Sequence, residues 1–153
     1  TFLAIQKKNH TALKNALAQI PEVSFRRIPD ESGDSCTFLS WFLPTEEATK
    51  AVVAELKARN ILAGNFYWFV NNWHYISKWD HLKNAVTLNS LHPDLKAAVI
   101  HHATKDFGAS DAIMSRCIST AIGLTWTDEQ LKTKCDQMVA VIQKVLSELK
   151  VAL

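Results

Sequence analysis

The end of the chain carries the pattern that most restricts the fold. Thr127 and Gln130 stand three residues apart, as in a capping box, in which each side chain bonds the other residue's backbone N–H at a helix start. Apolar residues then recur at every third or fourth position, at Leu131, Cys135, Met138, Val139, Ile142, Val145, Leu146 and Leu149. This spacing predicts one long helix with a single apolar face. Such a face is normally buried against another layer of structure.

The segments before this helix alternate between helical and strand patterns. Helices are predicted at 2–19, closed by Pro21, and from the N-cap Thr45 to Asn60. Shorter helices are predicted at 95–102 and at 110–116, the second with Ser110 as its N-cap. Strands are predicted at 23–28, 37–43, 61–66 and 118–124.

The strand at 37–43 indicates how these elements combine. It reads TFLSWFL, apolar nearly throughout, which predicts a central strand covered on both faces. A polar turn at 29–35 separates it from the strand at 23–28, so the two are predicted to pair antiparallel. The fold class is therefore α+β, a small mostly antiparallel sheet with helices packed on one face.

Composition narrows the class of protein. The 153 residues suit one domain, with 48% hydrophobic and 21% charged residues. A net charge of +2, spread along the chain, gives no reason to expect nucleic acid or a membrane surface as partner, and no apolar run is long enough to span a bilayer. The odd number of cysteines, Cys36, Cys117 and Cys135, predicts reduced, buried or half-buried thiols in a cytoplasmic protein.

The stretch from Ile61 to Leu82 is the main candidate for function. It reads ILAGNFYWFVNNWHYISKWDHL and holds three of the five Trp, among Asn and His side chains. Aromatic rings with polar tips suit a wall around a polar, flat or sugar-like ligand. The alternative is a hydrophobic plug whose polar tips reach water.

Other familiar sites are missing. The four Gly are scattered rather than gathered in a phosphate loop, and there is no G-x-S-x-G, CxxC or H-E-x-x-H. His101 and His102 would point about 100° apart on a helix, so they do not predict a metal site. His10, within the first helix, is expected to be solvated or to flank the helix. No metal site and no catalytic residue is therefore predicted in this chain.

Three stretches carry a resemblance to a known family. Lys57–Leu82 has a helix, a strand start at Asn60-Ile61, an aromatic step at Tyr67-Trp68, and Asn72 or His74 in the loop that follows. ISTAIGLTWTDEQL, at 118–131, reads as a strand, a turn and a capped final helix, and the segment 5–20 reads as a helix leading out of a preceding domain.

In these features the chain resembles the C-terminal small domain of the DegT/DnrJ/EryC1/StrS family, fold-type I sugar aminotransferases that use pyridoxal phosphate. It departs from the family at Asn60, where the family has Gly, at Trp68, where it has Pro, and in the late strand, which lacks a Pro. Among subgroups it looks closest to the enzyme that aminates C8 of a 3,8-dideoxy-octulosonate sugar for lipopolysaccharide.

The resemblance implies that this chain and a second, larger domain have separate roles. Residues 1–153 would form one C-terminal domain, a leading helix at 1–20 and an α+β sandwich at 21–153. The pyridoxal phosphate and its Schiff-base lysine would belong to a large domain preceding Thr1, and the lack of a starting Met agrees with that expectation. Glutamate would donate the amino group, a keto or aldehyde sugar would accept it, and the enzyme would be a homodimer.

The small domain would then form the wall on the substrate side of the cofactor. Substrate contacts are expected from Tyr67, Asn72, Trp73, His74 and Arg116, the last facing a carboxylate. A structural ion pair is the alternative for Arg116, and docking of domains is the alternative for Trp68 and Trp79. The competing interpretation of the whole chain is a free-standing α+β binding or dimerisation module, with the aromatic stretch as a protein interface.

Overall fold

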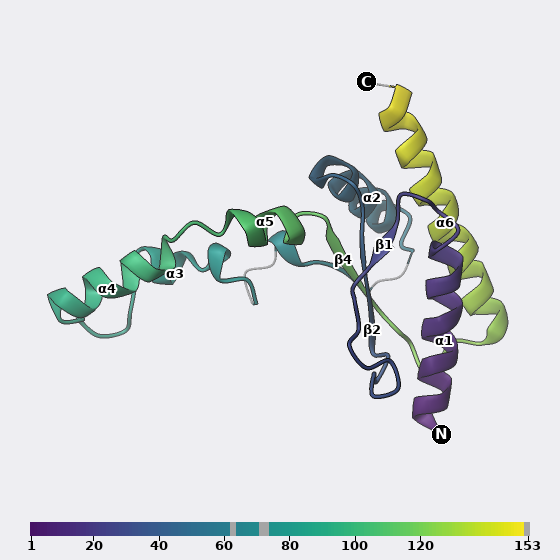
Figure 1. Cartoon of the computed structure of the whole chain (residues 1–153), viewed down its shortest axis with the longest axis horizontal. Helices are drawn as coiled ribbons and strands as arrows, with labels where there is room; N and C mark the ends of the chain where they lie inside the picture. Colours follow the sequence, from purple (N-terminus) through teal and green to yellow (C-terminus); the bar gives the residue numbers. More distant parts are fainter. Residues whose placement is uncertain (62–63, 71–73, 152–153) are drawn as a thin grey trace.

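The computed structural model describes residues 1–61, 64–70 and 74–151 (Figure 1). Its elements in chain order are α1 (Phe2–Leu17), β1 (Ser24–Phe25), β2 (Phe38–Phe42), α2 (Glu46–Ala58), β3 (Asn65–Tyr67), the 3₁₀ turns η1 (Trp68–Val70) and η2 (Ile76–Lys78), α3 (Asp80–Lys83), α4 (Pro93–Ala103), α5 (Gly108–Met114), β4 (Cys117–Ala121) and α6 (Asp128–Val151). Each predicted helix and strand is present, with shifted ends. No helix within the described ranges combines the length and apolar character needed to cross a bilayer.

The described strands form one antiparallel sheet in the order β1-β2-β4-β3. β1 pairs with β2 as predicted, and the centre of the sheet is the pair β2 and β4. Trp41 on β2 and Tyr67 on β3 both lie opposite Ile118 on β4, so these three side chains share one face. The predicted fold class, α+β with a mostly antiparallel sheet, is confirmed.

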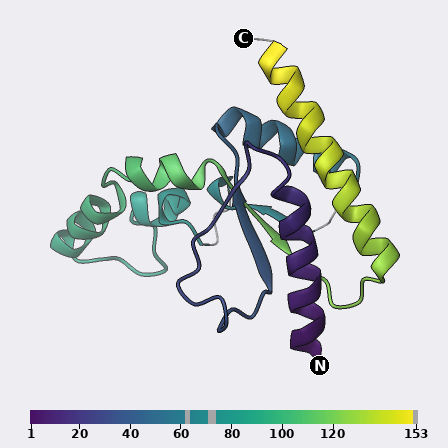
Figure 2. The ribbon, with the colours of Figure 1, turned by 45° about the vertical axis from the view of Figure 1, so that its right-hand side comes forward.

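One face of the sheet is covered by α1, α2 and α6, which confirms the predicted packing of helices on one face. Figures 1 and 2 show α1 and α6 side by side over this face, with α2 at the end of α6 nearer the C-terminus. The core between the helices and the sheet is apolar and buried; its members include Leu17, Leu39, Trp41, Val52, Leu56, Ile118, Met138 and Ile142. The apolar face predicted for the last helix is thus the largest helical contribution to this core.

The helix starts follow the predicted caps. Gln130 donates its backbone N–H to Thr127 Oγ1 over 3.2 Å, and Thr127 donates its own to Gln130 Oε1 over 3.0 Å. Thr45 Oγ1 accepts the backbone N–H of Ala48 over 3.1 Å at the start of α2. A cap of this kind stabilises a protein by about 1 kcal/mol.

The end of α2 depends on Asn60, which stands where the family that the sequence resembles has Gly. Asn60 adopts the left-handed conformation with φ of 53°. Asn60 N–H bonds the carbonyl of Lys57 and Ile61 N–H bonds that of Leu56, both over 3.0 Å, the bonds of a Schellman motif. Asn is among the few residues besides Gly that enter this conformation readily, so the turn survives the change.

The segment between η1 and β4 leaves the sheet as an arm. Figure 1 shows α5, α3 and α4 extending away from the sheet on the side opposite α1 and α6, with α3 packed against α4. Several apolar side chains on this arm are exposed, among them Val86, Leu88, Leu95 and Ile113. The arm contributes no described residue to the core beneath the helices.

Two sequence predictions about this framework were wrong. The strand at 37–43 is not covered on both faces, because α1, α2 and α6 pack on one face and Phe38 on the other remains 43% exposed. α5 does not begin at Ser110 but at Gly108, with Phe107 as N-cap. The reason is local: Asp106 Oδ1 accepts the Gly108 N–H over 2.8 Å, which sets the turn two residues earlier.

His10 is also placed differently from the prediction. It is buried, with 5% of its surface exposed, rather than solvated. The cause is the polar turn that follows β1, which folds back over α1 so that Ile28, Asp34 and Cys36 line the same cavity as His10. The predicted burial of all three cysteines is confirmed.

Candidate functional site

The face of the sheet that the long helices leave uncovered offers the best site for a ligand. Side chains alternate along a strand, so Phe38, Ser40 and Phe42 of β2 point away from the core that Leu39 and Trp41 enter. The register places Ser119 of β4 opposite both Ser40 and Phe66 of β3. We call this surface the open face.

A cavity of about 460 Å³ lies on the open face. β2 and β4 form its floor. Arg26, which directly follows β1, the aromatic stretch and α5 form its walls. The lining residues are Arg26, Ser40, Phe42, Trp68, His74, Tyr75, Ile113, Met114, Cys117 and Ser119. The size and the mixture of rings with a few polar groups fit a small-molecule site.

A row of rings runs from the sheet to this cavity. Phe38 meets Phe66 edge-on with ring centroids 6.0 Å apart, and Phe66 stacks on Trp68 at 5.6 Å. Trp68 then meets His74 edge-on at 5.2 Å. Contacts of these kinds hold the rings at fixed angles, which is what a stacking surface for a flat or sugar-like ligand requires.

Some polar groups of the cavity are hydrogen-bonded to other protein groups, whereas one charged group is not paired within the described parts of the chain. Ser40 and Ser119 share a hydrogen bond of 2.8 Å between their hydroxyls, and the Tyr75 hydroxyl donates to the Asp111 carboxylate. Arg26 is exposed, and no carboxylate pairs with it among the described residues. Its guanidinium is therefore the available cation for an acidic ligand.

The thiol of Cys117 does not provide a nucleophile. Burial raises the pKa of Cys117, and this outweighs the lowering by the Arg26 charge and by a hydrogen bond with Ser119. A thiol with a raised pKa is protonated at neutral pH and unreactive. Cys117 therefore contributes to the lining of the cavity as a protonated thiol.

Tyr67, one of the predicted substrate contacts, lies on the helix-covered face instead. It is 8% exposed, and its hydroxyl donates to the carbonyl of Ser115 over 2.8 Å. Burial, with a smaller contribution from the Glu46 carboxylate, raises the pKa of Tyr67 to about 12. Its polar tip is engaged within the protein and does not reach the cavity.

The other predicted contacts have three different outcomes. His74 is exposed and lines the cavity beside Trp68. Asn72 and Trp73 lie outside the described residues. Arg116 turns its Nε to the carbonyl of Ala112 over 2.9 Å, does not line the cavity, and has no ion pair within the described parts of the chain.

The structure adds residues that sequence reasoning missed. Arg26 and Ser119 line the cavity, although neither was singled out from the sequence, whereas Tyr75, which also lines it, belongs to the aromatic stretch. Alternation was the usable signal for Ser119, because the residues of a strand that do not enter the core must face the other side. Arg26 carries no such signal, since it follows the two-residue strand β1 and reaches the cavity only through the pairing of β1 with β2.

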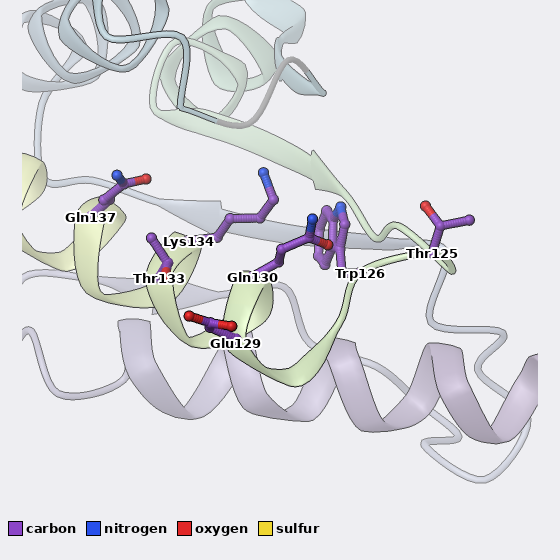
Figure 3. A pocket seen from close by; sticks show the side chains of 7 residues that line it. All are labelled: Thr125, Trp126, Glu129, Gln130, Thr133, Lys134 and Gln137. Atoms are coloured by element: carbon purple, nitrogen blue, oxygen red, sulfur yellow. The ribbon is translucent and has the colours of Figure 1, made fainter.

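A second depression, of about 520 Å³, lies along the start of α6 and differs in character (Figure 3). Most of its lining is exposed and polar, from Thr125 to Gln137, and Lys134 Nζ sits 5.5 Å from the centre of the Trp126 ring. The indole packs close to Gly123, where an added Cβ would come within 2.4 Å of the Trp126 Nε1. The lining residues of this depression include one aromatic side chain, Trp126, and therefore no row of stacked rings.

The cofactor implied by the resemblance can be tested against the cavity. Pyridoxal phosphate needs an amine for its Schiff base and donors for its phosphate. The cavity lining includes one basic side chain, Arg26, and no lysine. These residues do not fit the cofactor by themselves, so this chain could contribute only part of the surroundings of the cofactor.

The comparisons with known proteins bear on the fold. No family model matches the chain. Among solved structures, the chain is similar to the crystal structure of 3-amino-5-hydroxybenzoic acid (AHBA) synthase, with a TM-score of 0.56 and 17% sequence identity. The match covers 94% of this chain and 35% of that chain, so this chain spans about a third of the length of that protein. The likeness shows a shared fold over nearly the whole of this chain.

Proposed function

We propose that this chain forms the substrate-side wall of a pyridoxal-phosphate-dependent sugar aminotransferase. The open face carries the proposal: a ring-lined cavity of about 460 Å³ faces away from the helices that cover the other side of the sheet. The shared fold with AHBA synthase over 94% of the chain supports the class of enzyme. The catalytic lysine and most cofactor contacts would come from a large domain outside these 153 residues.

In this role the chain's own residues bind and orient the substrate. The rings of Trp68 and Phe42 offer apolar faces to the C–H surface of a sugar, while His74 offers a ring nitrogen to a hydroxyl. Closing the open face onto a second domain would also exclude water from the cavity. The cofactor, when bound, would serve as the electron sink for amino transfer from glutamate to the keto or aldehyde sugar.

Arg26 adds a specific substrate contact to the proposal. The Arg26 guanidinium, at the cavity edge and with no carboxylate partner among the described residues, fits a carboxylate in a bidentate manner. Both glutamate and an octulosonate sugar, the substrate of the lipopolysaccharide subgroup that we propose, carry a carboxylate that Arg26 could bind. We propose Arg26 for the carboxylate contact in place of Arg116, whose side chain points to the carbonyl of Ala112.

The assembly and location remain part of the same proposal. The proposed homodimer would follow if a partner subunit completes the cavity. A cytoplasmic location is supported by three cysteines that are free and buried.

The test uses the protein in its natural length. Amino transfer from glutamate to a keto sugar acid is measured for the natural protein and for Trp68→Ala and Arg26→Gln. We expect each change to lower kcat/KM by about tenfold or more, since a tenfold change corresponds to about 1.4 kcal/mol of lost interaction. Glu129→Gln, in the depression of Figure 3, is the matched control and is expected to leave kcat/KM unchanged.

Two results would overturn the proposal. The first is equal loss of activity in the Glu129→Gln control and in the open-face variants. The second is a natural protein with a mass near 17.2 kDa and no associated subunit that binds pyridoxal phosphate, because the chain itself offers no lysine at the cavity. Intact-mass measurement on the protein from its source decides this second point.

A free-standing binding or dimerisation module is the second candidate, and the arm favours it. Val86, Leu88 and Leu95 are exposed apolar side chains on one protruding segment. Exposed apolar surface gathered in this way is typical of a protein interface. Sedimentation of the chain with and without Leu88→Asp separates the two ideas, since self-association through the arm would be lost in the variant.

A further inference from the structure

A small group of side chains that can bind a metal lies between α1 and the turn that precedes β2, and none of its members lines the open-face cavity. It combines His10 of α1 with Asp34 and Cys36 from the turn that precedes β2. A ring nitrogen of His10, a carboxylate oxygen of Asp34 and Sγ of Cys36 all lie within 4.8 Å of one another. All three residues line one cavity of about 270 Å³.

Two atoms in this group are buried without a partner. His10 is 5% exposed, and its Nε2 has no hydrogen-bond partner among the described residues. Asp34 Oδ2 is also a buried atom without a hydrogen-bond partner among the described residues. Buried polar atoms are nearly always bonded to protein, water or an ion, so a pair of unbonded ones facing a single cavity indicates that something is bound there.

The turn holds the two ligands from the loop in place. Asp34 Oδ1 accepts the backbone N–H of Cys36 over 3.0 Å, which leaves Oδ2 as the unbonded oxygen. Cys36 adopts a φ of 57°, in the left-handed region that a Cys rarely enters. A strained conformation fixed by a side-chain bond is a common property of residues that hold a ligand.

We propose that His10, Asp34 and Cys36 bind a zinc ion, with water from the cavity as the fourth ligand. Thiolate, imidazole and carboxylate are the ligand types that Zn²⁺ takes, whereas Mg²⁺ and Ca²⁺ select oxygen ligands alone. Zn–S of about 2.3 Å and Zn–N or Zn–O of about 2.0 Å put tetrahedral ligand atoms roughly 3.3–3.6 Å apart. The present separations, which are at most 4.8 Å, therefore need to close by about 1.5 Å at most, a movement available to a surface turn.

The charges of the site balance on binding. Cys36 loses its thiol proton to solvent, so thiolate and carboxylate together carry two negative charges against the two positive charges of the ion, with no change of oxidation state. Two nearby lysines are held elsewhere: Lys7 donates to the carbonyl of Ser32 over 3.1 Å, and Lys14 lies 3.5 Å from Glu31. The ammonium groups of these two lysines therefore do not occupy the position of the proposed zinc ion.

Zinc at this position would tie the turn at 29–36 to α1. That link is separate from the proposed transferase role, since none of the three ligands lines the open-face cavity. The site would therefore be structural, or open to a ligand at its fourth position, whatever the open face binds.

The experiment adds Zn²⁺ or Co²⁺ to the purified reduced chain. We expect one ion per chain, and with Co²⁺ a thiolate-to-metal charge-transfer band together with the visible bands of a tetrahedral site. Cys36→Ser should abolish the charge-transfer band and weaken Zn²⁺ binding by at least about tenfold. Cys135→Ser, which removes another buried thiol, is the matched control and should leave both readouts unchanged.

A second variant guards against misfolding. Asp34→Asn keeps an oxygen that can accept the Cys36 N–H, so the turn is retained while the charged ligand is lost. It should weaken Zn²⁺ binding with an unchanged far-ultraviolet circular dichroism spectrum. Absence of the cobalt band in the unaltered chain, or binding that survives Cys36→Ser but is lost in His101→Ala, would overturn the proposal.

Discussion

The two faces of the sheet both carry large aromatic side chains, yet they differ in what lies above them. On one face Trp41 is fully buried beneath α1, α2 and α6, and its Nε1 donates to Thr120 Oγ1 over 3.0 Å. On the other, Phe38 and Phe66 are 43% and 38% exposed and contact each other edge-on. Rings on the covered face hold the fold together, and rings on the open face are available to a ligand or a partner. The following predictions test how far this difference extends.

The largest effect is expected on the covered face. Trp41→Ala removes a fully buried ring and its hydrogen bond with Thr120, leaving a cavity between sheet and helices. We expect the free energy of unfolding to fall by about 3–5 kcal/mol. Urea titration followed by circular dichroism measures it, and a loss below about 1 kcal/mol would contradict the assignment of this face as the core.

Tyr67 sharpens the comparison because it belongs to the covered face although its neighbours Phe66 and Trp68 belong to the open one. Burial raises the pKa of Tyr67 from its ordinary value of 10.0 to about 12, so above pH 10 the unfolded chain loses this proton before the folded chain does. Folding stability should therefore fall as pH rises from 10 to 12, with a contribution of about 1.4 kcal/mol per pH unit from this residue.

The variant Tyr67→Phe should remove that contribution. Its free energy of unfolding is expected to be lower than that of the unaltered chain at pH 7, by about 1 kcal/mol for the lost bond to the Ser115 carbonyl. The difference between the two proteins should shrink and then reverse as pH approaches 12. Parallel pH profiles for the two proteins would show that the hydroxyl is not buried.

On the open face a change of similar size should matter less. Trp68→Ala loses stacking on Phe66 and the edge contact with His74, and we expect a cost of about 1 kcal/mol in the free energy of unfolding. The same urea titration measures it. A cost equal to that of Trp41→Ala would mean that the open face is as closely packed as the core.

Phe38→Ser should have the smallest effect. The ring is largely exposed and has one aromatic neighbour, so a cost of about 0.5 kcal/mol is expected from the lost contact with Phe66. If the open face docks onto another domain, the same variant in the full-length protein should loosen that contact without unfolding the chain. Limited proteolysis of the longer protein provides the readout.

Sequence reasoning succeeded where the cause is local. The capping box at Thr127 and Gln130, the N-cap at Thr45 and the helix end at Asn60 each depend on residues within one turn, and each was found in place. The antiparallel pairing of the first two strands followed from a polar turn between two apolar runs. The fold class followed from the order of these elements.

It failed where the cause is distant in the sequence. An apolar run such as 37–43 does not reveal whether helices cover one face or both, because that depends on where α1 and α6 pack. Tyr67 and His74 looked equivalent as polar-tipped rings, yet the pairing of β3 with β4 sends Tyr67 into the covered face. His10 gave no signal, since its neighbours Asp34 and Cys36 lie in a turn that only the folded chain brings to α1.

The order of the strands has one more consequence. β3 and β4 are antiparallel neighbours, with Tyr67 opposite Ile118, so residues 68–116 begin and end at the same place on the sheet. The whole excursion is in effect the loop of a hairpin, and none of its described residues belongs to the core beneath the helices. Insertions of this kind can lengthen, shorten or change sequence during evolution while the scaffold stays intact. Changes in this loop would reshape one wall of the cavity, at Trp68, His74, Tyr75, Ile113 and Met114, while Arg26 and the strand residues of its floor stay in place.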